Sequence, residues 1–337
     1  MAAVPLDMLA VLAEGSRKPL RLVQMSTPRP GPGEVLVRVV ASAVNPLDTK
    51  ILAGIADHAR QPLPAVLGID MAGTVVDAGQ GTETLREGDA VYGMVGGVGG
   101  HPGSLAEYMV ADIRLLASKP ANLTMREAAA VPLVFITAWE GLVDRAALRA
   151  GQRVLIQGGA GGVGQMALQI ARARGAITAA TGSPAARTAI EELGAHYVER
   201  ADPPAEIVAR LTGGQGFDVV FDTAGGASLD AAFAMVRRFG HVVSALGWGT
   251  HALAPLSFRA ASYSGIFTLL PLLTGEGREH HGAILAEATK LAEAGALVPR
   301  LDPRRFTFAT VNEAYRAIEA GMVRGKIVVD VTQQAGS

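Results

Sequence analysis

The chain has no cysteine among its 337 residues, and this absence excludes several kinds of site. Without cysteine there can be no disulfide, no iron–sulfur cluster, no thiolate nucleophile and no zinc site that needs a cysteine ligand. A chain of this length can bury a large core without cross-links, so its length does not require an oxidising compartment. At roughly 100–200 residues per domain, two domains are expected.

An excess of charge is also missing. Thirty Lys and Arg stand against 31 Asp and Glu, a formal net charge of −1, and there is no polybasic run. The electrostatic footprint of a nucleic-acid-binding protein is therefore absent.

Long hydrophobic runs are missing as well. The most apolar stretches, residues 128–139 and 266–273, are shorter than the roughly 18–20 residues of a bilayer span. Residues 1–13 carry Asp7 and have no basic flank, so they make a poor signal peptide. We therefore expect a cytoplasmic protein that does not associate with a membrane.

Glycine, by contrast, is abundant, at 41 residues, and has no three-residue period that would indicate collagen. In the first third, β-rich runs follow one another with glycine-containing turns and no helix between them, which favours an antiparallel, barrel-like module. These runs are residues 35–40, 72–76 and 90–92.

From about residue 125 the pattern changes, and strands alternate with helices until about residue 260. Such alternation is typical of a parallel sheet with helices on both faces. The predicted strands are residues 153–157, 177–181, 218–222 and 241–245. Beyond residue 260 we expect two helices, at 280–294 and 311–320, and a closing strand at 326–331.

One glycine motif follows a predicted strand and leads directly into a predicted helix. Gly159-Ala-Gly161-Gly162-Val163-Gly164 matches G-x-G-x-x-G, a weak signal alone but a stronger one in this context. Glycine there permits a tight turn and lets the backbone approach a pyrophosphate at the helix N-terminus. The alternative is a glycine-rich turn that holds nothing.

The next strand indicates which dinucleotide is bound. It ends at Ala180-Thr181-Gly182-Ser183, and no carboxylate follows until Glu191. An acidic residue there would repel a 2′-phosphate, so its absence, with Ser183 and Arg187 nearby, favours NADP(H). The alternative is that Arg187 is simply a solvated helix residue.

Several further segments follow one another along almost the whole chain. They are residues 29–37, 45–48, Leu67-Gly-Ile-Asp-Met-Ala-Gly73, 88–93, 103–108, Thr137-Ala-Trp-Glu140, 161–164, 217–222 and Gly325-Lys-Ile-Val-Val329. One of them, Asn45-Pro-Leu-Asp48, could by itself be only a turn. Taken together in this order and spacing, the segments resemble the medium-chain dehydrogenase/reductase superfamily, and specifically its zinc-independent quinone oxidoreductase branch.

The resemblance implies an α/β protein: a GroES-like β-rich catalytic domain (residues 1–125 and 262–337) and a Rossmann NADP-binding domain with a doubly wound parallel sheet (126–261). Zinc-dependent relatives place a His-Glu pair where this chain has Ile69-Asp70, so no metal site is expected. A homodimer is also expected, often through edge strands of the Rossmann sheets; residues 240–245 and 256–273 are candidate surfaces.

The resemblance also implies residue roles. Asn45 would donate to the substrate carbonyl, Asp48 would orient Asn45 or its turn, and Tyr92 could add a hydroxyl donor. Thr137 would lie by the nicotinamide and the backbone of Leu246 and Gly247 near its carboxamide. The expected cofactor-binding set is Thr137, Gly159, Gly161, Gly162, Val163, Gly164, Thr181, Ser183, Arg187, Leu246, Gly247 and Lys326.

Two departures affect the 2′-phosphate contacts. Many relatives have Lys where this chain has Ala186, and often Tyr where it has Arg200-Ala201. The contacts that those residues make with the 2′-phosphate would have to come from Arg187, Arg200 or Arg324 instead.

The implied reaction is hydride transfer from NADPH to a quinone or an α,β-unsaturated carbonyl compound without zinc. Such acceptors are already electrophilic and need only hydrogen-bond donors for the charge that develops on oxygen. Alternatives are an enoyl-thioester reductase or an alcohol dehydrogenase on the same scaffold, or a dinucleotide-binding redox sensor without catalysis.

Overall fold

The computed structural model describes residues 4–331 and divides into two compact units. The β-rich unit comprises residues 1–133 and 269–337, and the parallel-sheet unit comprises Val134–Thr268.

The β-rich unit is built on a seven-stranded sheet in which β3 pairs with β5, β7 and β16. Nearly all of β3 is buried, so it forms the centre of this unit. The order is β15-β16-β3-β5-β6-β8, with β7 alongside β3. The strands are β3 (Glu34–Val44), β5 (Asp70–Ala78), β6 (Ala90–Met94), β7 (Tyr108–Asp112), β8 (Leu116–Ser118), β15 (Phe306–Thr307) and β16 (Ile327–Asp330).

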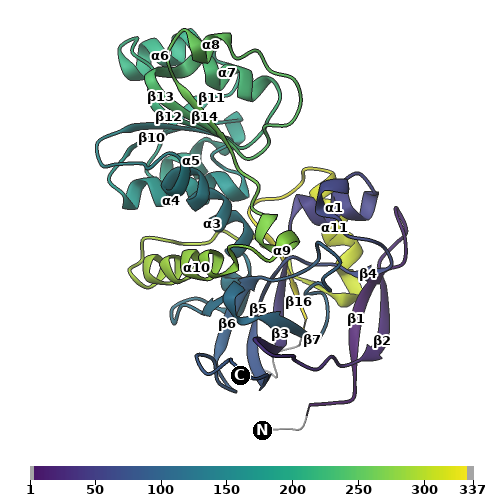
Figure 1. Cartoon of the computed structure of the whole chain (residues 1–337). Helices are drawn as coiled ribbons and strands as arrows, with labels where there is room; N and C mark the ends of the chain where they lie inside the picture. The colour runs from purple at the N-terminus through teal and green to yellow at the C-terminus, as the bar shows by residue number, and fades with distance from the viewer. Residues whose placement is uncertain (1–3, 332–337) are drawn as a thin grey trace. The chain divides into compact units, whose positions relative to one another are not determined.

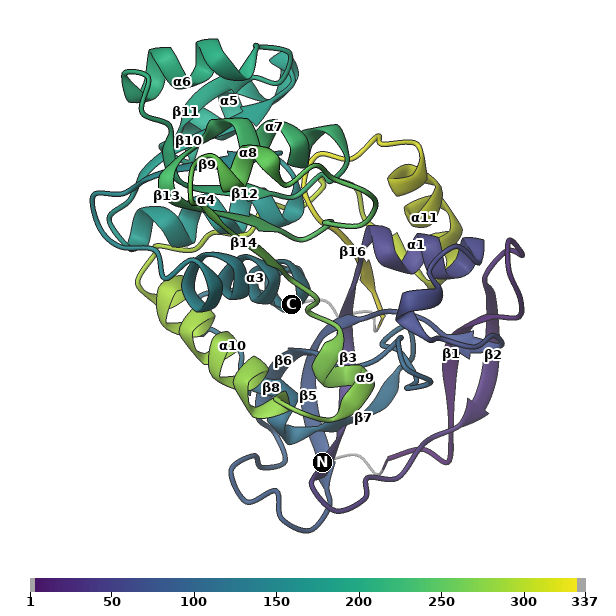
Figure 2. The same ribbon diagram turned by 45° about the horizontal axis from the view of Figure 1, so that its top comes forward.

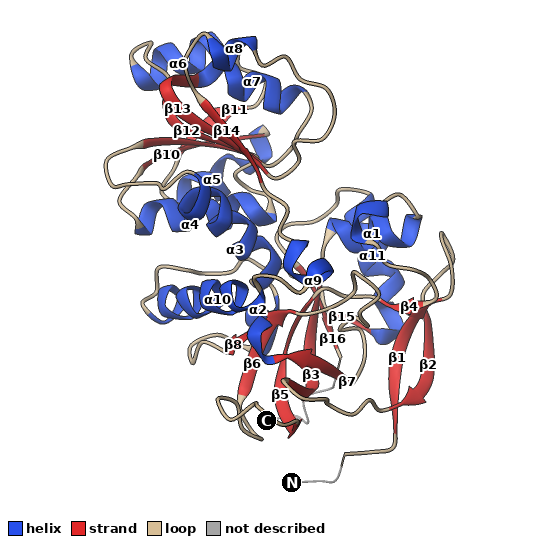
Figure 3. Ribbon diagram, viewed as in Figure 1, coloured by secondary structure: helices blue, strands red, loops and turns tan. Residues whose placement is uncertain are grey.

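A second, three-stranded sheet in this unit has the order β2-β1-β4. Its strands are β1 (Asp7–Ala13), β2 (Arg21–Ser26) and β4 (Ala65–Val66). The strands of both sheets, coloured red in Figure 3, confirm the sheet-rich domain that the sequence predicted.

Helices from both ends of the chain cover these sheets. Helix α1 (Pro46–Ala53) follows β3 directly and lies beside α11 (Val311–Glu319), as Figures 1 and 2 show. Helix α10 (Arg278–Glu293) packs against β6 and β8. A Cβ at Gly282 would lie 2.5 Å from the Arg114 carbonyl oxygen, so glycine permits this close approach. The remaining helices are α2 (Met125–Ala129) and α9 (Leu270–Thr274).

The parallel-sheet unit has six parallel strands in the order β11-β10-β9-β12-β13-β14. This is the doubly wound order 3-2-1-4-5-6, whose direction reverses between β9 and β12. The predicted Rossmann architecture is therefore confirmed. The strands are β9 (Arg153–Gln157), β10 (Ile177–Gly182), β11 (His196–Glu199), β12 (Phe217–Asp222), β13 (Val236–Ser244) and β14 (Ser262–Gly265).

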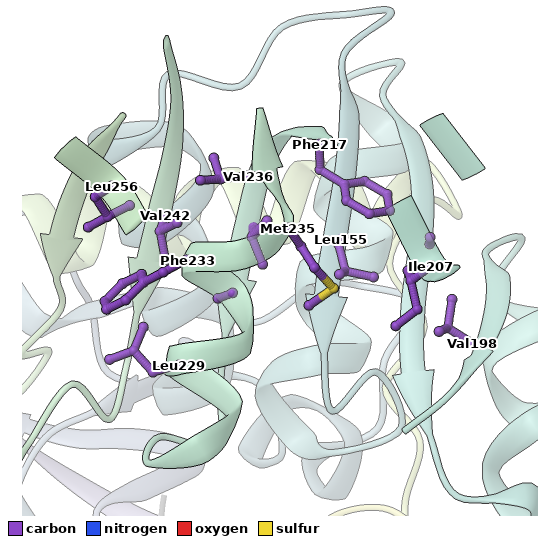
Figure 4. Close-up of a cluster of buried hydrophobic side chains, with 13 residues drawn as sticks. Leu155, Val198, Ile207, Phe217, Leu229, Phe233, Met235, Val236, Val242 and Leu256 are labelled. Atoms are coloured by element: carbon purple, nitrogen blue, oxygen red, sulfur yellow. The ribbon is translucent and has the colours of Figure 1, made fainter. Parts of the chain in front are cut away.

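Helices cover both faces of this sheet (Figure 1). One face carries α4 (Gly162–Ala173) and α5 (Arg187–Glu192), and the other carries α6 (Pro204–Thr212), α7 (Ala227–Met235) and α8 (Ala254–Ser257). Figure 4 shows the core under α6 and α7, a single cluster to which Ile207, Phe233 and Leu155 of the central strand belong. Helix α3 (Pro132–Trp139) continues into a π-helical segment, residues 140–145.

The structure corrects two predictions at the edges of this unit. The chain divides at Leu133/Val134 and Thr268/Leu269, later than the predicted 125/126 and 261/262. The reason is that α2 packs against β3 and β5, whereas β14 pairs with β13 as a sixth strand. Residues 240–245 lie largely in β13, which has a neighbour on each side, so β14 and not β13 is the edge strand.

Within residues 4–331, no helix combines the length and the apolar character that a membrane crossing requires. The cytoplasmic location stays a prediction.

Candidate functional site

The glycine motif forms the turn between β9 and α4, at the point where the strand order reverses. Gly158, just before the motif, has φ +81°, a left-handed conformation that favours glycine. A Cβ at Gly164 would lie 2.1 Å from the Gly158 carbonyl oxygen, and one at Gly159 would lie 2.5 Å from the Ala180 Cβ. Side chains at these two positions would push the helix away from the strands.

The start of α4 presents backbone donors. Gly161 is the N-cap of α4, and Gly162, Val163 and Gly164 form its first turn. The N–H groups of a first turn have no hydrogen-bond acceptor within the helix. Gly161 is exposed, and a Cβ there would meet only the Gly158 carbonyl oxygen, at 3.3 Å. Exposed N–H groups at the positive end of a helix fit a pyrophosphate.

Two threonines hold this turn in place. The Gly158 N–H donates to Thr181 Oγ1 at the end of β10 (3.1 Å), and Thr223 Oγ1, just after β12, donates to the Gln157 carbonyl (2.6 Å). Thr181 therefore supports the turn from the neighbouring strand. Sequence reasoning missed Thr223, whose only signal is its position at a strand end.

The candidate 2′-phosphate residues follow β10. Ser183 precedes a short 3₁₀ turn, and Arg187 begins α5. The Arg187 side chain is 60% exposed, lies 4.4 Å from the centre of the Tyr197 ring and pairs with Glu191 at 3.6 Å. The Arg200 N–H donates to the Gly182 carbonyl (3.0 Å), so Arg200 also lies at this end of the sheet. Arg324 belongs to the β-rich unit.

The turns after β12 and β13 are tied together by a buried carboxylate that sequence reasoning missed. Asp222 accepts from Ser244 Oγ (2.7 Å) and from the Gly225 N–H (3.0 Å). The Leu246 N–H donates to Ser244 Oγ (3.1 Å), so this network positions the Leu246–Gly247 backbone.

Thr137 lies in a short hydrogen-bonded chain. Thr268 Oγ1 donates to the Glu140 carboxylate (2.7 Å) and lies 3.1 Å from Thr137 Oγ1.

In the β-rich unit, two charged side chains from distant parts of the sequence meet around the amide of Asn45. Asn45 is 1% exposed, and its Nδ2 donates to Asp70 Oδ2 (3.0 Å) while its Oδ1 accepts from Lys326 Nζ (2.5 Å). Lys326 Nζ is 3.7 Å from Asp70 Oδ2, so a buried ion pair flanks the amide. Sequence reasoning missed Asp70, although it stands within a motif that carried the resemblance.

Asp48 stabilises the turn that carries the Asn45 amide. Its carboxylate accepts from the Asn45 N–H (2.7 Å) and the Gly68 N–H (3.2 Å). Burial raises the pKa of Asp48 to about 7, because water no longer solvates the charged form. The Tyr315 hydroxyl, whose pKa is raised by burial and by the nearby Asp48 charge, is buried without a hydrogen-bond partner within residues 4–331.

The structure thus brings together Asn45, Asp48 and Lys326 but places Tyr92 elsewhere. The fully buried Tyr92 donates its hydroxyl to the Leu285 carbonyl of α10 (2.7 Å), and burial raises the pKa of the phenol. Its hydroxyl therefore anchors α10. The ammonium of Lys326, expected at the cofactor, contacts Asn45 and Asp70, and its contact with a cofactor stays a prediction.

Comparison with known proteins agrees with this architecture. Family profiles match at residues 31–121 (alcohol dehydrogenase GroES-like domain) and 193–329 (zinc-binding dehydrogenase). A 2-methylene-furan-3-one reductase of Solanum lycopersicum and a chloroplastic NADPH-dependent alkenal/one oxidoreductase of Arabidopsis thaliana are each 36% identical over 303 residues. These alignments cover 88% of this chain and 71% and 72% of the relatives.

The fold has a close counterpart among solved structures. The crystal structure of an alcohol dehydrogenase superfamily protein from Novosphingobium aromaticivorans matches with a TM-score of 0.95 and 54% identity. The match covers 96% of this chain and 100% of that one.

The description of the second profile raises the question of zinc. The chain has no cysteine, and residues 4–331 contain no group of three or more His, Asp or Glu side chains that could hold a metal ion. Asp70, which stands in the expected ligand segment, already faces the ammonium of Lys326. The residues present therefore do not fit a zinc site.

Proposed function

Because the chain belongs to the alcohol dehydrogenase superfamily, we propose that it is an NADPH-dependent reductase of α,β-unsaturated carbonyl compounds, with quinones as a second class of acceptor. The observation that carries this proposal is the buried Asn45 carboxamide, a neutral hydrogen-bond donor held between Asp70 and Lys326. The names of the two plant relatives, one an alkenal/one oxidoreductase and the other a furanone reductase, support an enone.

The parallel-sheet unit would hold the dinucleotide. The N–H groups of Gly162, Val163 and Gly164 would bind the pyrophosphate, and the glycine cradle leaves room for it. When bound, NADPH supplies the hydride.

The preference for NADPH over NADH rests on the residues that follow β10. Ser183 and Arg187 would bind the 2′-phosphate, and the first carboxylate after that strand, Glu191, is already paired with Arg187. Thr181, Thr137 and the Leu246–Gly247 backbone would complete the cofactor contacts.

The β-rich unit would act on the carbonyl group. As hydride reaches the β-carbon of an enone, negative charge develops on the carbonyl oxygen, and an N–H donor such as Asn45 stabilises that charge. Asp48 fixes the turn that carries this donor. An acceptor of this kind does not need a metal ion as Lewis acid, so we propose zinc-independent turnover.

The test is the initial rate of oxidation of NADPH and of NADH, each with a simple enone and a simple quinone, with and without a chelator. We expect faster turnover with NADPH and no effect of the chelator. A preference for NADH would contradict the assignment of Ser183 and Arg187 to a 2′-phosphate. Saturable NADPH binding without turnover of any acceptor would favour the non-catalytic redox sensor.

We also propose that the protein is a homodimer joined through the edge strand β14. Among the described strands only β13 pairs with β14, and Tyr263 and Phe267 in the same stretch are 38% and 37% exposed. An edge strand with free backbone groups and apolar neighbours favours pairing with a second copy. The test is light scattering at micromolar concentration. The mass of a monomer would contradict the proposal.

A further inference from the structure

The bonding partners of Asn45 leave its carboxamide only one orientation. Lys326 is a donor, and its Nζ lies 2.5 Å from Asn45 Oδ1, whereas Asp70 is an acceptor, and its Oδ2 lies 3.0 Å from Asn45 Nδ2. Rotating the amide by 180° would set Nδ2 against an ammonium and Oδ1 against a carboxylate. The second N–H of Nδ2, which has no bond to any described residue, therefore keeps a fixed direction.

This arrangement is costly for the fold. Asp70 is fully buried and Lys326 is 6% exposed, and burial lowers the pKa of Lys326 and raises that of Asp70 while the two charges oppose these shifts. Well-packed apolar residues of similar volume are often as stabilising as a buried ion pair. Stability alone therefore gives a weak reason for this pair, and its contacts with Asn45 give a better one.

We propose that Lys326 is a positioning residue for the reduction: with Asp70, its ammonium group fixes the Asn45 carboxamide and polarises it, so that the remaining N–H is a stronger donor to the carbonyl oxygen of the acceptor. This inference rests on the proposed function. A positive charge at the amide oxygen draws electron density from the amide nitrogen and makes its N–H groups more acidic. In the low-dielectric interior of a protein, polarisation of this kind strengthens neighbouring hydrogen bonds.

The proposal predicts a dependence on the acceptor that a purely structural role would not produce. A weakly electrophilic enone needs more stabilisation of the developing oxyanion than a strongly electrophilic quinone. Loss of the polarising charge should therefore slow the enone more than the quinone. A protein that is merely misfolded in part would lose both activities in the same proportion.

The experiment compares Lys326→Met, the charge-neutral pair Lys326→Met/Asp70→Asn, and the control Lys290→Met with the wild-type protein. Lys290 is an exposed lysine that pairs with Glu287 on α10, so the control makes the same change of residue type away from the site. For each variant, kcat and KM are measured across a series of enones and quinones of graded electrophilicity, and the Kd of NADPH is measured by fluorescence titration.

We expect Lys326→Met to lower kcat for enones by about 10- to 100-fold and to lower kcat for quinones by a smaller factor. Loss of an oxyanion donor itself costs roughly 100- to 1,000-fold, and here the donor remains but is weakened. The Kd of NADPH should stay within about twofold, since a lost cofactor bond would change it by tenfold for each 1.4 kcal/mol. The double variant, which leaves no unpaired charge, should show the same dependence on the acceptor even if Lys326→Met is too unstable to assay.

Two results would overturn the inference. Equal loss of activity with all acceptors would mean that the ion pair only maintains the fold. A raised Kd for NADPH with unchanged kcat would mean that Lys326 contacts the cofactor, as the sequence alone suggested. Failure of the proposed function is distinguishable, because the wild-type protein itself would then reduce neither enones nor quinones.

Discussion

The two units prepare their candidate sites by opposite means. In the parallel-sheet unit the site is made by omitting side chains, since a Cβ at Gly159 or Gly164 would collide with neighbouring atoms. In the β-rich unit the site is made by adding charged side chains, since Asp70 and Lys326 are buried around Asn45. The first presents backbone donors, and the second presents a side-chain donor whose strength depends on neighbouring charges.

This difference predicts how each site tolerates change. A backbone site depends on close packing and is insensitive to pH. A buried charged site depends on a balance of desolvation and pairing, so removal of one member leaves another uncompensated. Four substitutions test this contrast.

The largest effect is expected from breaking the buried pair. Lys326→Met should lower the free energy of unfolding by about 3–5 kcal/mol, because it leaves the Asp70 charge buried without its partner. Adding Asp70→Asn should recover most of this loss. Urea denaturation of the three proteins measures the effect, and a double variant no more stable than Lys326→Met would contradict the pairing.

The next effect is a dependence on pH that belongs to the β-rich unit. Asp48 has a pKa of about 7 in the folded protein, against 3.8 ordinarily, so the folded state binds more protons between these values. The stability from this group is fully present below about pH 4 and is lost as the pH rises through 7. Asp48→Asn should remove this slope, a change on the order of 2–4 kcal/mol between pH 5 and 8.

The measurement is thermal or urea unfolding of both proteins across that range. The charged groups that face Asp48 are Asp70 and Lys326, and the Tyr315 hydroxyl also lies near it. All three remain in the variant, so the difference between the two curves isolates Asp48. Parallel curves would show that Asp48 does not titrate in this range.

A smaller effect is expected in the glycine cradle. Gly164→Ala places a Cβ against the Gly158 carbonyl and should destabilise the protein by about 1–3 kcal/mol, as overpacking does. NADPH binding should weaken more than tenfold, because the start of α4 must move. Gly15→Ala is the control, since its Cβ would meet only the Lys18 side chain at 3.6 Å. Unchanged NADPH binding in Gly164→Ala would contradict the assignment of this turn to the cofactor site.

The smallest effect concerns the 2′-phosphate. Arg187→Ala should raise the Kd of NADPH about fivefold to tenfold and leave that of NADH unchanged, because an exposed ionic contact contributes little. Arg210→Ala, which removes a similarly exposed arginine paired with Asp202, should change neither value. An equal change for both cofactors would contradict a contact with the 2′-phosphate.

The same contrast explains what the sequence could predict. The glycine cradle lies within six consecutive positions between a strand and a helix, so local spacing was enough to predict it. The doubly wound sheet was predicted from alternation, which missed β11 and β14, each a strand of only four residues.

The Asn45 cluster could be predicted only in part. Asn45 and Lys326 are 281 positions apart, and Asp70 comes from a third segment, so no local pattern reports their contact. The resemblance supplied Asn45 and Asp48 but gave no role to Asp70. It also grouped Lys326 with the cofactor residues and Tyr92 with the donors. The contacts of these side chains with Asn45 and with α10 depend on tertiary packing, which the resemblance did not supply.

The pairing of β16 with β3 also has a consequence for biosynthesis. The strand beside Lys326 leaves the ribosome long after β3, so β3 waits with one neighbour missing while more than two hundred residues are translated. The parallel-sheet unit is continuous in sequence and can close during that interval. Nascent chains should therefore acquire a dinucleotide-binding fold before Asn45 acquires its partners, and a ribosome stalled before residue 326 would display only the first of the two sites.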